Sequence, residues 1–156
     1  MAEKKTVPFV VEAAGTGVAQ EVTVLGDRQH VFHADTYPSF GGQDAAPSPL
    51  SYVLGALTSC HQVTGSLVAG DLGVQLGRWT FRVQGDLDPS VISRGAEGNA
   101  NFDRVSIDVQ VQTDATPEQF ERLSAETARR CPVTQMVKRS GLEFVSEWRA
   151  VPLEAA

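Results

Sequence analysis

Cysteine is scarce in this sequence, where Cys60 and Cys131 are the only two among 156 residues. They are far apart along the chain and form no Cys-x-x-Cys pair, which excludes a thioredoxin-type motif and a zinc knuckle. The P-loop, the GxGxxG loop and the GxSxG nucleophile motif are also missing. Any chemistry is therefore expected from the two thiols.

Basic residues are also few, with 13 Lys and Arg against 19 Asp and Glu and a formal net charge of −6. The densest basic cluster is Arg129 and Arg130 with Lys138 and Arg139. A nucleic-acid site usually needs a larger basic face that follows the phosphates. We expect no nucleic-acid partner, and the charge favours solubility.

Long apolar runs are absent as well. The most apolar stretch, residues 50–69, is interrupted repeatedly by Ser, Thr, His and Gln, so we expect no membrane span. The first residues, Met-Ala-Glu-Lys-Lys-Thr-Val-Pro, do not contain the apolar core of about 7–15 residues that a signal peptide has. These absences predict a cytoplasmic protein, in which cysteines stay reduced.

The composition itself is that of a globular protein, with 42% hydrophobic and 21% charged residues. The length predicts one domain over residues 1–156. Apolar runs and alternating patterns bounded by turn residues indicate strands. The strands are expected at residues 7–12, 18–25, 28–34, 74–88, 102–113 and 142–151, with loops at 35–48 and 89–101.

A long helix is predicted between the third and fourth strands. Ser48 suits the N-cap and Pro49 the first helical position, and the helix should end before Gly70 or Gly73. Apolar residues recur at spacings of three and four, which predicts one buried stripe. The stripe contains Leu50, Val53, Leu54, Leu57, Cys60, Thr64, Leu67 and Val68.

Two further helices are predicted before the last strand. Thr116 begins a capping box, and Pro132 interrupts the pattern at Cys131 and starts a short helix over residues 133–139. Strands and helices come in blocks, which favours an α+β fold with antiparallel sheets.

The two cysteines occupy different predicted settings. Cys60 lies on the helix stripe, where a free cysteine is commonly a small buried hydrophobe and burial raises the thiol pKa. Cys131 precedes Pro132 at a helix start, where free N–H groups and the helix dipole favour a thiolate, with Arg129 and Arg130 adding positive charge. An inert cap is the alternative for Cys131.

The histidines complete the set of candidate metal ligands. On one strand, His30 and His33 point to opposite faces. On one helix, Cys60 and His61 diverge by about 100° and cannot easily share an ion. We expect no metal site and no cofactor.

Two segments resemble the OsmC/Ohr family, the osmotically inducible and organic-hydroperoxide-resistance proteins. The first runs from Gly42 through Pro49 to Cys60, and the second is Arg130-Cys131-Pro132-Val133. Length and element order agree over nearly the whole chain. The resemblance implies an α+β fold, an intertwined homodimer and a central helix that carries the first cysteine.

The resemblance also implies a role for each thiol. Cys60 matches the peroxidatic cysteine, which attacks a small-molecule hydroperoxide and becomes a sulfenic acid. Cys131 matches the resolving cysteine, which condenses with it to a disulfide that a dithiol reductant reopens. Sulfenic acids and thiolates undergo these reactions in general.

The chain departs from the family pattern at the groups that activate the first thiol. The position after the proline, usually glutamate, is Leu50, and the glycine turn at residues 14–17 has no arginine. Arg28 is the nearest candidate cation. The sequence thus resembles the divergent OsmC-like branch, and without a cation Cys60 should be mostly protonated at neutral pH.

Two functions remain open from the sequence. The first is thiol-dependent reduction of organic hydroperoxides through Cys60 and Cys131. The alternative is a non-catalytic module that binds a small apolar or thiol-reactive ligand in the cleft of the dimer interface, which the apolar Leu50 favours.

Overall fold

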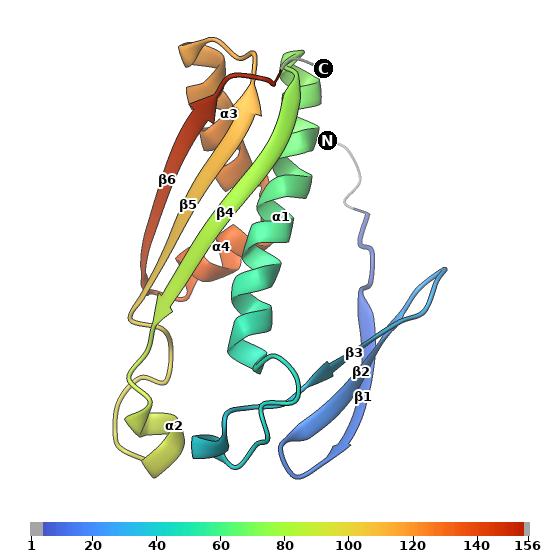
Figure 1. Ribbon diagram of the computed structural model, residues 1–156, viewed down its shortest axis with the longest axis vertical. Coiled ribbons are helices and arrows are strands. Elements are labelled where there is room, and N and C mark those ends of the chain that lie inside the picture. Colours follow the sequence, from blue (N-terminus) through green and yellow to red (C-terminus); the bar gives the residue numbers. More distant parts are fainter. Residues whose placement is uncertain (1–4, 155–156) are drawn as a thin grey trace. The chain divides into compact units, whose positions relative to one another are not determined.

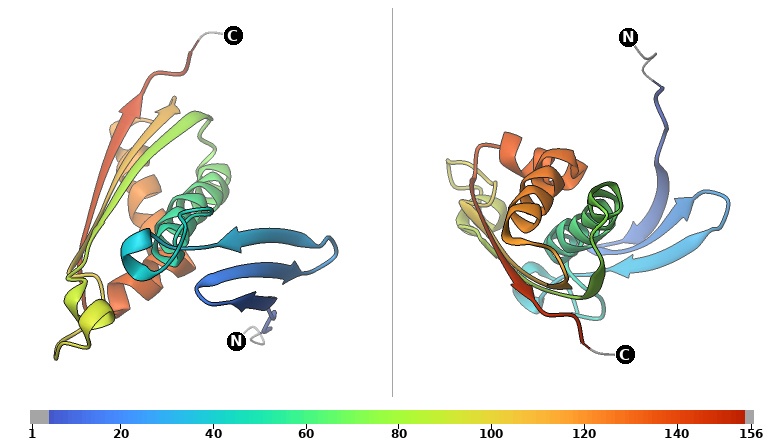
Figure 2. Two further views of the ribbon diagram at one scale, coloured as in Figure 1. Left: turned by 60° about the horizontal axis from the view of Figure 1, so that its bottom comes forward. Right: turned by 90° about the horizontal axis from the view of Figure 1, so that it is seen from above.

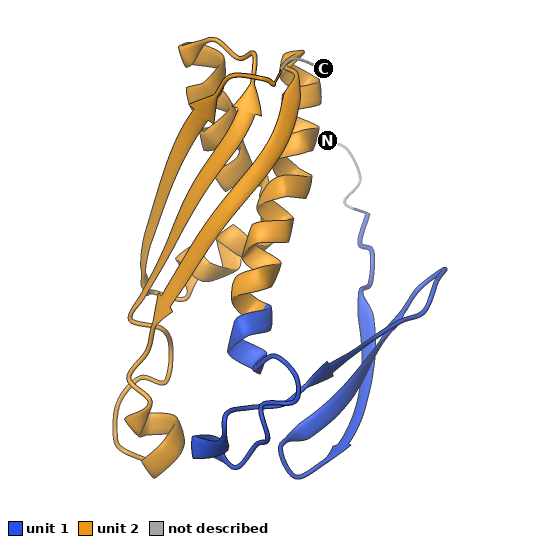
Figure 3. Cartoon of the chain, viewed as in Figure 1, with its two compact units in different colours: residues 1–52 blue, residues 53–156 orange. Residues whose placement is uncertain are grey.

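The computed structural model describes residues 5–154 (Figure 1). The chain forms two compact units, residues 1–52 and 53–156 (Figure 3). The expectation of one domain over residues 1–156 stays a prediction. The elements in chain order are β1 Val10–Thr16, β2 Ala19–Leu25, β3 His30–Ala34, α1 Pro49–Leu72, β4 Leu76–Asp86, α2 Ser90–Arg94, β5 Arg104–Thr113, α3 Pro117–Arg130, α4 Pro132–Arg139 and β6 Glu143–Val151.

The first unit contains a three-stranded antiparallel sheet in the order β1-β2-β3. The predicted strands at 18–25 and 28–34 are confirmed with small shifts of their ends. The first strand begins three residues later than predicted, at Val10, and extends to Thr16 because it pairs with β2 through a turn at Gly17. Gly17 has φ of 66°, a left-handed conformation that suits glycine.

The second unit contains a sheet in the order β4-β5-β6. β4 and β5 pair antiparallel as predicted, but β5 and β6 pair parallel, so the expectation of antiparallel sheets is wrong for this pair. The reason is that α3 and α4 return the chain to the starting end of β5 before β6 begins. A parallel pair needs such a crossover connection, whereas an antiparallel pair can use a short turn.

Helices α1, α3 and α4 lie on one face of this sheet, as the end-on view shows (Figure 2). The alternation predicted for residues 102–113 is confirmed, because the inward side chains of β5 form the core. Val105, Ile107 and Val109 pack with Leu57 of α1. A second cluster joins α1 to α3 through Val68, Ala69, Val74 and Leu123.

The predicted buried stripe of α1 is only partly correct. Leu57 and Val68 are buried, but Leu50, Val53 and Leu67 are exposed. Spacings of three and four recur on more than one side of a long helix that is apolar over much of its surface, so periodicity alone mixed two faces. The face that is buried within the second unit consists of Leu57, His61, Thr64, Gly65, Val68 and Ala69.

The predicted helix ends are confirmed. The Ser48 hydroxyl accepts a hydrogen bond from Ser51 N at 3.2 Å at the start of α1, which ends before Gly73. Thr116 and Gln119 form both hydrogen bonds of a capping box at the start of α3. One short helix, α2, lies within the segment predicted as a loop at residues 89–101.

No helix within residues 5–154 has both the length and the apolar character needed to cross a membrane.

A candidate dithiol site

The two cysteines meet in the second unit. Cys60 comes from the middle of α1, and Cys131 comes from the junction between α3 and α4. Their Sγ atoms are 2.9 Å apart and share a hydrogen bond. A disulfide bond would be about 2.05 Å long, and both cysteines are free thiols. Residues far apart in the sequence therefore form one dithiol.

The backbone at Cys131 explains how the second thiol is held. Pro132 opens α4, and the residue before a proline avoids helical geometry, so Cys131 adopts extended angles of φ −73° and ψ 115°. Its N–H still donates to Thr127 O at the end of α3, and its carbonyl accepts from Gln135 N in α4. Cys131 thus closes one helix and begins the next, as predicted.

The N-terminus of α4 points its free N–H groups at the thiols. Thr134 N donates to Cys131 Sγ at 3.5 Å, and Cys131 is completely buried. Burial raises the pKa of the Cys131 thiol, but hydrogen bonds from the Cys60 thiol, from the Thr134 hydroxyl and N–H and from Val133 N–H together outweigh it, so the pKa is lowered overall. A helix start stabilises a thiolate in this way.

Cys60 has the opposite tendency. Burial raises its pKa, and the neighbouring Cys131 raises it further through the shared hydrogen bond and through its charge. The Val133 N–H and the Thr64 hydroxyl act in the lowering direction but do not compensate. This agrees with the expectation of a protonated Cys60.

The pair can therefore share one proton asymmetrically. The N-terminus of α4 favours the anionic form of Cys131, and Cys60 is the thiol that holds its proton more tightly. Cys60 is only partly buried whereas Cys131 is completely buried, so Cys60 is the more accessible of the two residues. The arrangement places one partly exposed and one buried cysteine with their sulfurs 2.9 Å apart.

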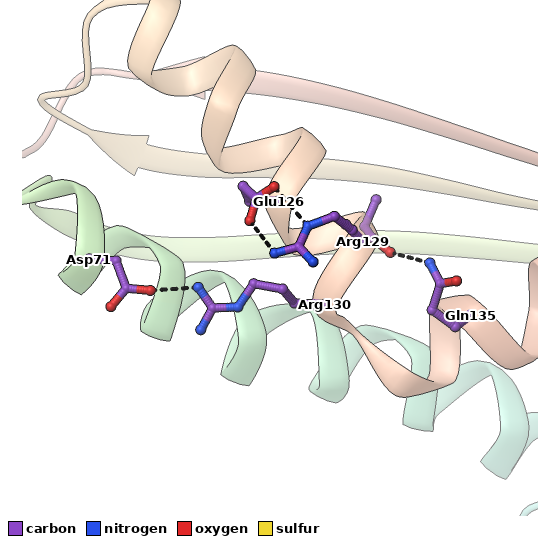
Figure 4. Close-up of polar contacts among 6 residues, drawn as sticks. Asp71, Glu126, Arg129, Arg130 and Gln135 are labelled. Atoms are coloured by element: carbon purple, nitrogen blue, oxygen red, sulfur yellow. Dashed lines mark hydrogen bonds and ion pairs between the residues drawn. The ribbon is translucent and has the colours of Figure 1, made fainter. Parts of the chain in front are cut away.

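The two arginines next to Cys131 form ion pairs with carboxylates. Arg129 forms a bidentate hydrogen bond with Glu126, and Arg130 pairs with Asp71 of α1 (Figure 4). Neither is among the groups that lower the pKa of Cys131. Both guanidinium groups, which the sequence predicts to add positive charge near the thiol, are directed to carboxylates instead.

Sequence reasoning missed two residues beside the dithiol, His61 and Thr134. His61 is completely buried, and its Nδ1 lies 3.0 Å from Leu57 O and 3.4 Å from Thr134 Oγ1. As the divergence of about 100° between neighbouring residues of a helix indicates, the His61 side chain points away from that of Cys60. The contact with Cys131 runs through Thr134, a residue of another helix, and only an explicit search for polar residues after the Cys-Pro pair could have suggested it.

We expect His61 to weaken the fold in mild acid. Burial lowers the pKa of His61 below its ordinary value of 6.5, and the positive charge of Lys138 acts in the same direction. The unfolded chain then binds a proton that the folded chain does not, so the free energy of unfolding falls as the pH drops below about 6.5. Chemical denaturation between pH 7.5 and pH 5 measures this loss.

The matched variants for this measurement are His61→Phe and His30→Asn, the latter at an exposed position of β3. The pH-dependent loss should be smaller in His61→Phe than in the unmodified protein and unchanged in His30→Asn. Parallel curves for His61→Phe and the unmodified protein would contradict the assignment.

Within residues 5–154, no group of three or more His, Cys, Asp and Glu is placed to hold a metal ion.

Fold and site together define an α+β protein with a dithiol between a long helix and a helix N-terminus. The family model described as OsmC-like protein matches residues 41–146, and the chain belongs to this family. No curated protein sequence matches the chain.

Solved structures of the family share the fold at low sequence identity. An OsmC-like protein from Mycoplasma pneumoniae has a TM-score of 0.74 at 16% identity, over 97% of this chain and 99% of the other. An organic hydroperoxide resistance protein from Elizabethkingia anophelis has a TM-score of 0.71 at 17% identity, over 96% and 100%. A putative organic hydroperoxide resistance protein from Vibrio cholerae, with captopril bound in one of the active sites, has a TM-score of 0.69 at 16% identity, over 98% and 99%.

Proposed function

We propose that this protein reduces organic hydroperoxides with Cys60 as the peroxidatic thiol and Cys131 as the resolving thiol. The observation that carries the proposal is the 2.9 Å contact between a partly exposed and a buried sulfur. Relatives named as organic hydroperoxide resistance proteins support the same chemistry at the level of the family.

The reaction balances without a cofactor. The Cys60 sulfur attacks the terminal oxygen of R–O–O–H, the O–O bond breaks, and the alkoxide leaves as R–OH once it has a proton. Cys60 becomes a sulfenic acid, and the Cys131 thiolate attacks its sulfur and expels hydroxide, which forms the disulfide. The peroxide gains two electrons, and the two thiols lose them. A dithiol reductant then reopens the disulfide by exchange.

The N-terminus of α4 takes the place of the missing arginine in this proposal. Val133 N–H contributes to lowering the pKa of both thiols, and Thr134 N–H contributes to lowering that of Cys131. Backbone donors at a helix start need no specific side chain, which explains how Leu50 can stand at the position of the family glutamate. The protonated resting state of Cys60 predicts slower peroxide reduction than a cation-activated thiolate would give.

The proposal includes a homodimer as the working form, in the cytoplasm, where thiols stay reduced. Val53, Cys60 and Leu67 are spaced by seven residues on α1 and so lie on nearly the same side of the helix. Val53 and Leu67 are 46% and 59% exposed, an unusual exposure for an apolar pair that flanks a reactive residue. A second copy that covers this face would complete the entrance to Cys60.

Binding without turnover is the second candidate. The raised pKa of Cys60 and the apolar Leu50 favour a site at the dimer interface that holds a small apolar or thiol-reactive ligand. In one relative, a molecule of captopril is bound in one of the active sites.

We expect cumene hydroperoxide to be consumed in the presence of a dithiol. Without the dithiol, one equivalent should convert the protein to a form with an intramolecular Cys60–Cys131 disulfide. Intact mass and peptide mapping of hydroperoxide-treated protein, with an untreated sample as the control, measure the product. Absence of both consumption and disulfide would refute the peroxidase proposal and favour the binding module.

A further inference from the structure

The imidazole ring of His61 has one hydrogen-bonded nitrogen and one that is not bonded. Nδ1 lies 3.0 Å from Leu57 O, and because a carbonyl oxygen only accepts, Nδ1 carries the hydrogen. Nε2 is buried and finds no hydrogen-bond partner within residues 5–154. In neutral His61 the hydrogen therefore lies on Nδ1, and the imidazole packs against the Trp148 ring with the two centroids 5.9 Å apart.

This tautomer fixes the direction of the Thr134 hydroxyl. Thr134 Oγ1 lies 3.4 Å from His61 Nδ1 and can only accept from that N–H, as the weaker branch of a shared donor. The hydroxyl hydrogen is then free to point elsewhere. It is then available to the Cys131 sulfur, which accepts a hydrogen bond from Thr134 N at 3.5 Å and whose pKa the Thr134 hydroxyl lowers.

We propose that His61 is a positioning residue for the dithiol, in which its Nδ1–H holds the Thr134 oxygen so that the hydroxyl hydrogen is directed to the Cys131 sulfur and favours its anionic form. His61 acts only through Thr134 and touches neither substrate nor sulfur. Four groups then favour the anion: the Thr134 hydroxyl, the Thr134 N–H, the Val133 N–H and the Cys60 thiol.

The consequence for chemistry rests on the proposed function. With the thiolate on Cys131, Cys60 loses its proton to Cys131 as its sulfur attacks the hydroperoxide oxygen. Cys131 then passes that proton to the departing alkoxide, which leaves as R–OH, and regains the thiolate that attacks the sulfenic acid. One proton moves along the dithiol in each cycle, so no separate base is needed.

Packing in the hydrophobic core alone explains less well why position 61 is a histidine. A buried polar atom with no partner costs about 1–3 kcal/mol, and a phenylalanine ring would fill a similar space without that cost. The hydrogen bond from Nδ1 to Leu57 O does not explain a histidine either, because that carbonyl belongs to the ladder of α1 itself. The contact with Thr134 links His61 to α4, whose N-cap is Cys131.

The charges that face this cluster are few. On α4, Lys138 is the cation that acts on His61. On α1, the titratable neighbour is Cys60, and Cys131 lies at the junction of α3 and α4. Trp148 of β6 and Thr127 of α3, which pack on the same helix face, do not titrate in the working range.

The test is a titration of the Cys131 thiolate by its ultraviolet absorbance in a Cys60→Ser background, with no peroxide present. Thr134→Val should raise the midpoint by about one pH unit, because a hydrogen bond to a charged group is worth about 1.5–3 kcal/mol and one pH unit about 1.4 kcal/mol. His61→Phe should raise the midpoint of the Cys131 titration by at least about half a pH unit. His61→Asn, whose side-chain amide N–H can occupy the place of Nδ1–H, should restore most of the shift.

An unchanged midpoint in folded His61→Phe, or an equal rise in His61→Asn, would overturn the proposal. If the His61 variants do not fold, the Thr134→Val variant is the test, and an unchanged titration midpoint in that variant would overturn the proposal. The outcome is separate from the peroxidase proposal. A shifted midpoint without hydroperoxide consumption would leave His61 as a positioning residue in a protein that is not a peroxidase. Hydroperoxide consumption with an unshifted midpoint would support the peroxidase proposal and overturn the role of His61.

Discussion

Replacing Cys60 by serine should abolish hydroperoxide consumption, while replacing Cys131 should stop the cycle one step later. In Cys60→Ser the reachable sulfur is gone, and the buried Cys131 has no access to the peroxide. In Cys131→Ser, Cys60 can still attack, but neither the thiolate that takes its proton nor the thiol that resolves the sulfenic acid is present. We expect at least about a hundredfold slower first turnover in Cys131→Ser, the usual range for loss of a proton acceptor.

Single-turnover measurements with one equivalent of cumene hydroperoxide separate the two roles. Cys131→Ser should accumulate a Cys60 sulfenic acid that dimedone traps, with no disulfide, and Cys60→Ser should give no adduct. The double variant should be no slower than Cys60→Ser, because groups that act as one unit are not additive. Ser59→Ala is the matched control, since the Ser59 hydroxyl bonds only to carbonyls of its own helix within residues 5–154. Turnover in Cys60→Ser would contradict the assignment of the peroxidatic thiol.

The proposed stepwise roles rest on the asymmetry of burial and pKa between the two cysteines. A thiolate is the better nucleophile, which by itself would favour Cys131 as the attacking residue. Access decides against that order, because Cys131 is completely buried and Cys60 is not. If Cys131 reacted first, the dimedone adduct would form in Cys60→Ser, so the same experiment distinguishes the two orders.

Local features of the fold were predictable because their causes are local. Ser48, Thr116 and Pro132 mark helix starts through the chemistry of their own side chains, and the structure confirms all three. The alternation in β5 was equally clear. The parallel pairing of β6 was not, because it depends on how far α3 and α4 carry the chain before the last strand begins.

The candidate site also has features that follow from local sequence and features that depend on contacts between distant elements. The placement of Cys131 at a helix start follows from the proline after it, and the sequence predicted it correctly. The contact between Cys60 and Cys131 could come only from the family resemblance, since spacing sets no distance between residues on different elements. His61 was discounted because it diverges from Cys60 on a helical wheel, and a wheel cannot show that Thr134 of α4 lies beside its ring.

Helix α1 packs so closely on the sheet at Gly65 that we expect no side chain to fit at this position. A Cβ there would lie 2.7 Å and 3.2 Å from two carbons of the Trp79 ring and 3.4 Å from Thr127 Oγ1. Trp79 is held in turn by Phe81 and Trp148, with ring centroids 5.6 Å and 5.7 Å away, so it has little freedom to move. Alanine normally stabilises a helix relative to glycine by about 1 kcal/mol. At Gly65 we expect Gly65→Ala to lower the free energy of unfolding by about 1–3 kcal/mol, the usual cost of overpacking.

Gly70 provides the matched control on the same helix, because a Cβ there meets nothing within 4 Å in the described chain. Gly70→Ala should raise the free energy of unfolding by about 0.5–1 kcal/mol, so the two substitutions should differ in sign. Chemical denaturation of both variants measures the difference, and a stabilised Gly65→Ala would contradict the close approach. Gly65 follows Cys60 by little more than one helical turn, so a shift of α1 away from Trp79 would also move the Cys60 sulfur relative to Cys131. We therefore expect Gly65→Ala, and not Gly70→Ala, to slow disulfide formation as well as to weaken the fold.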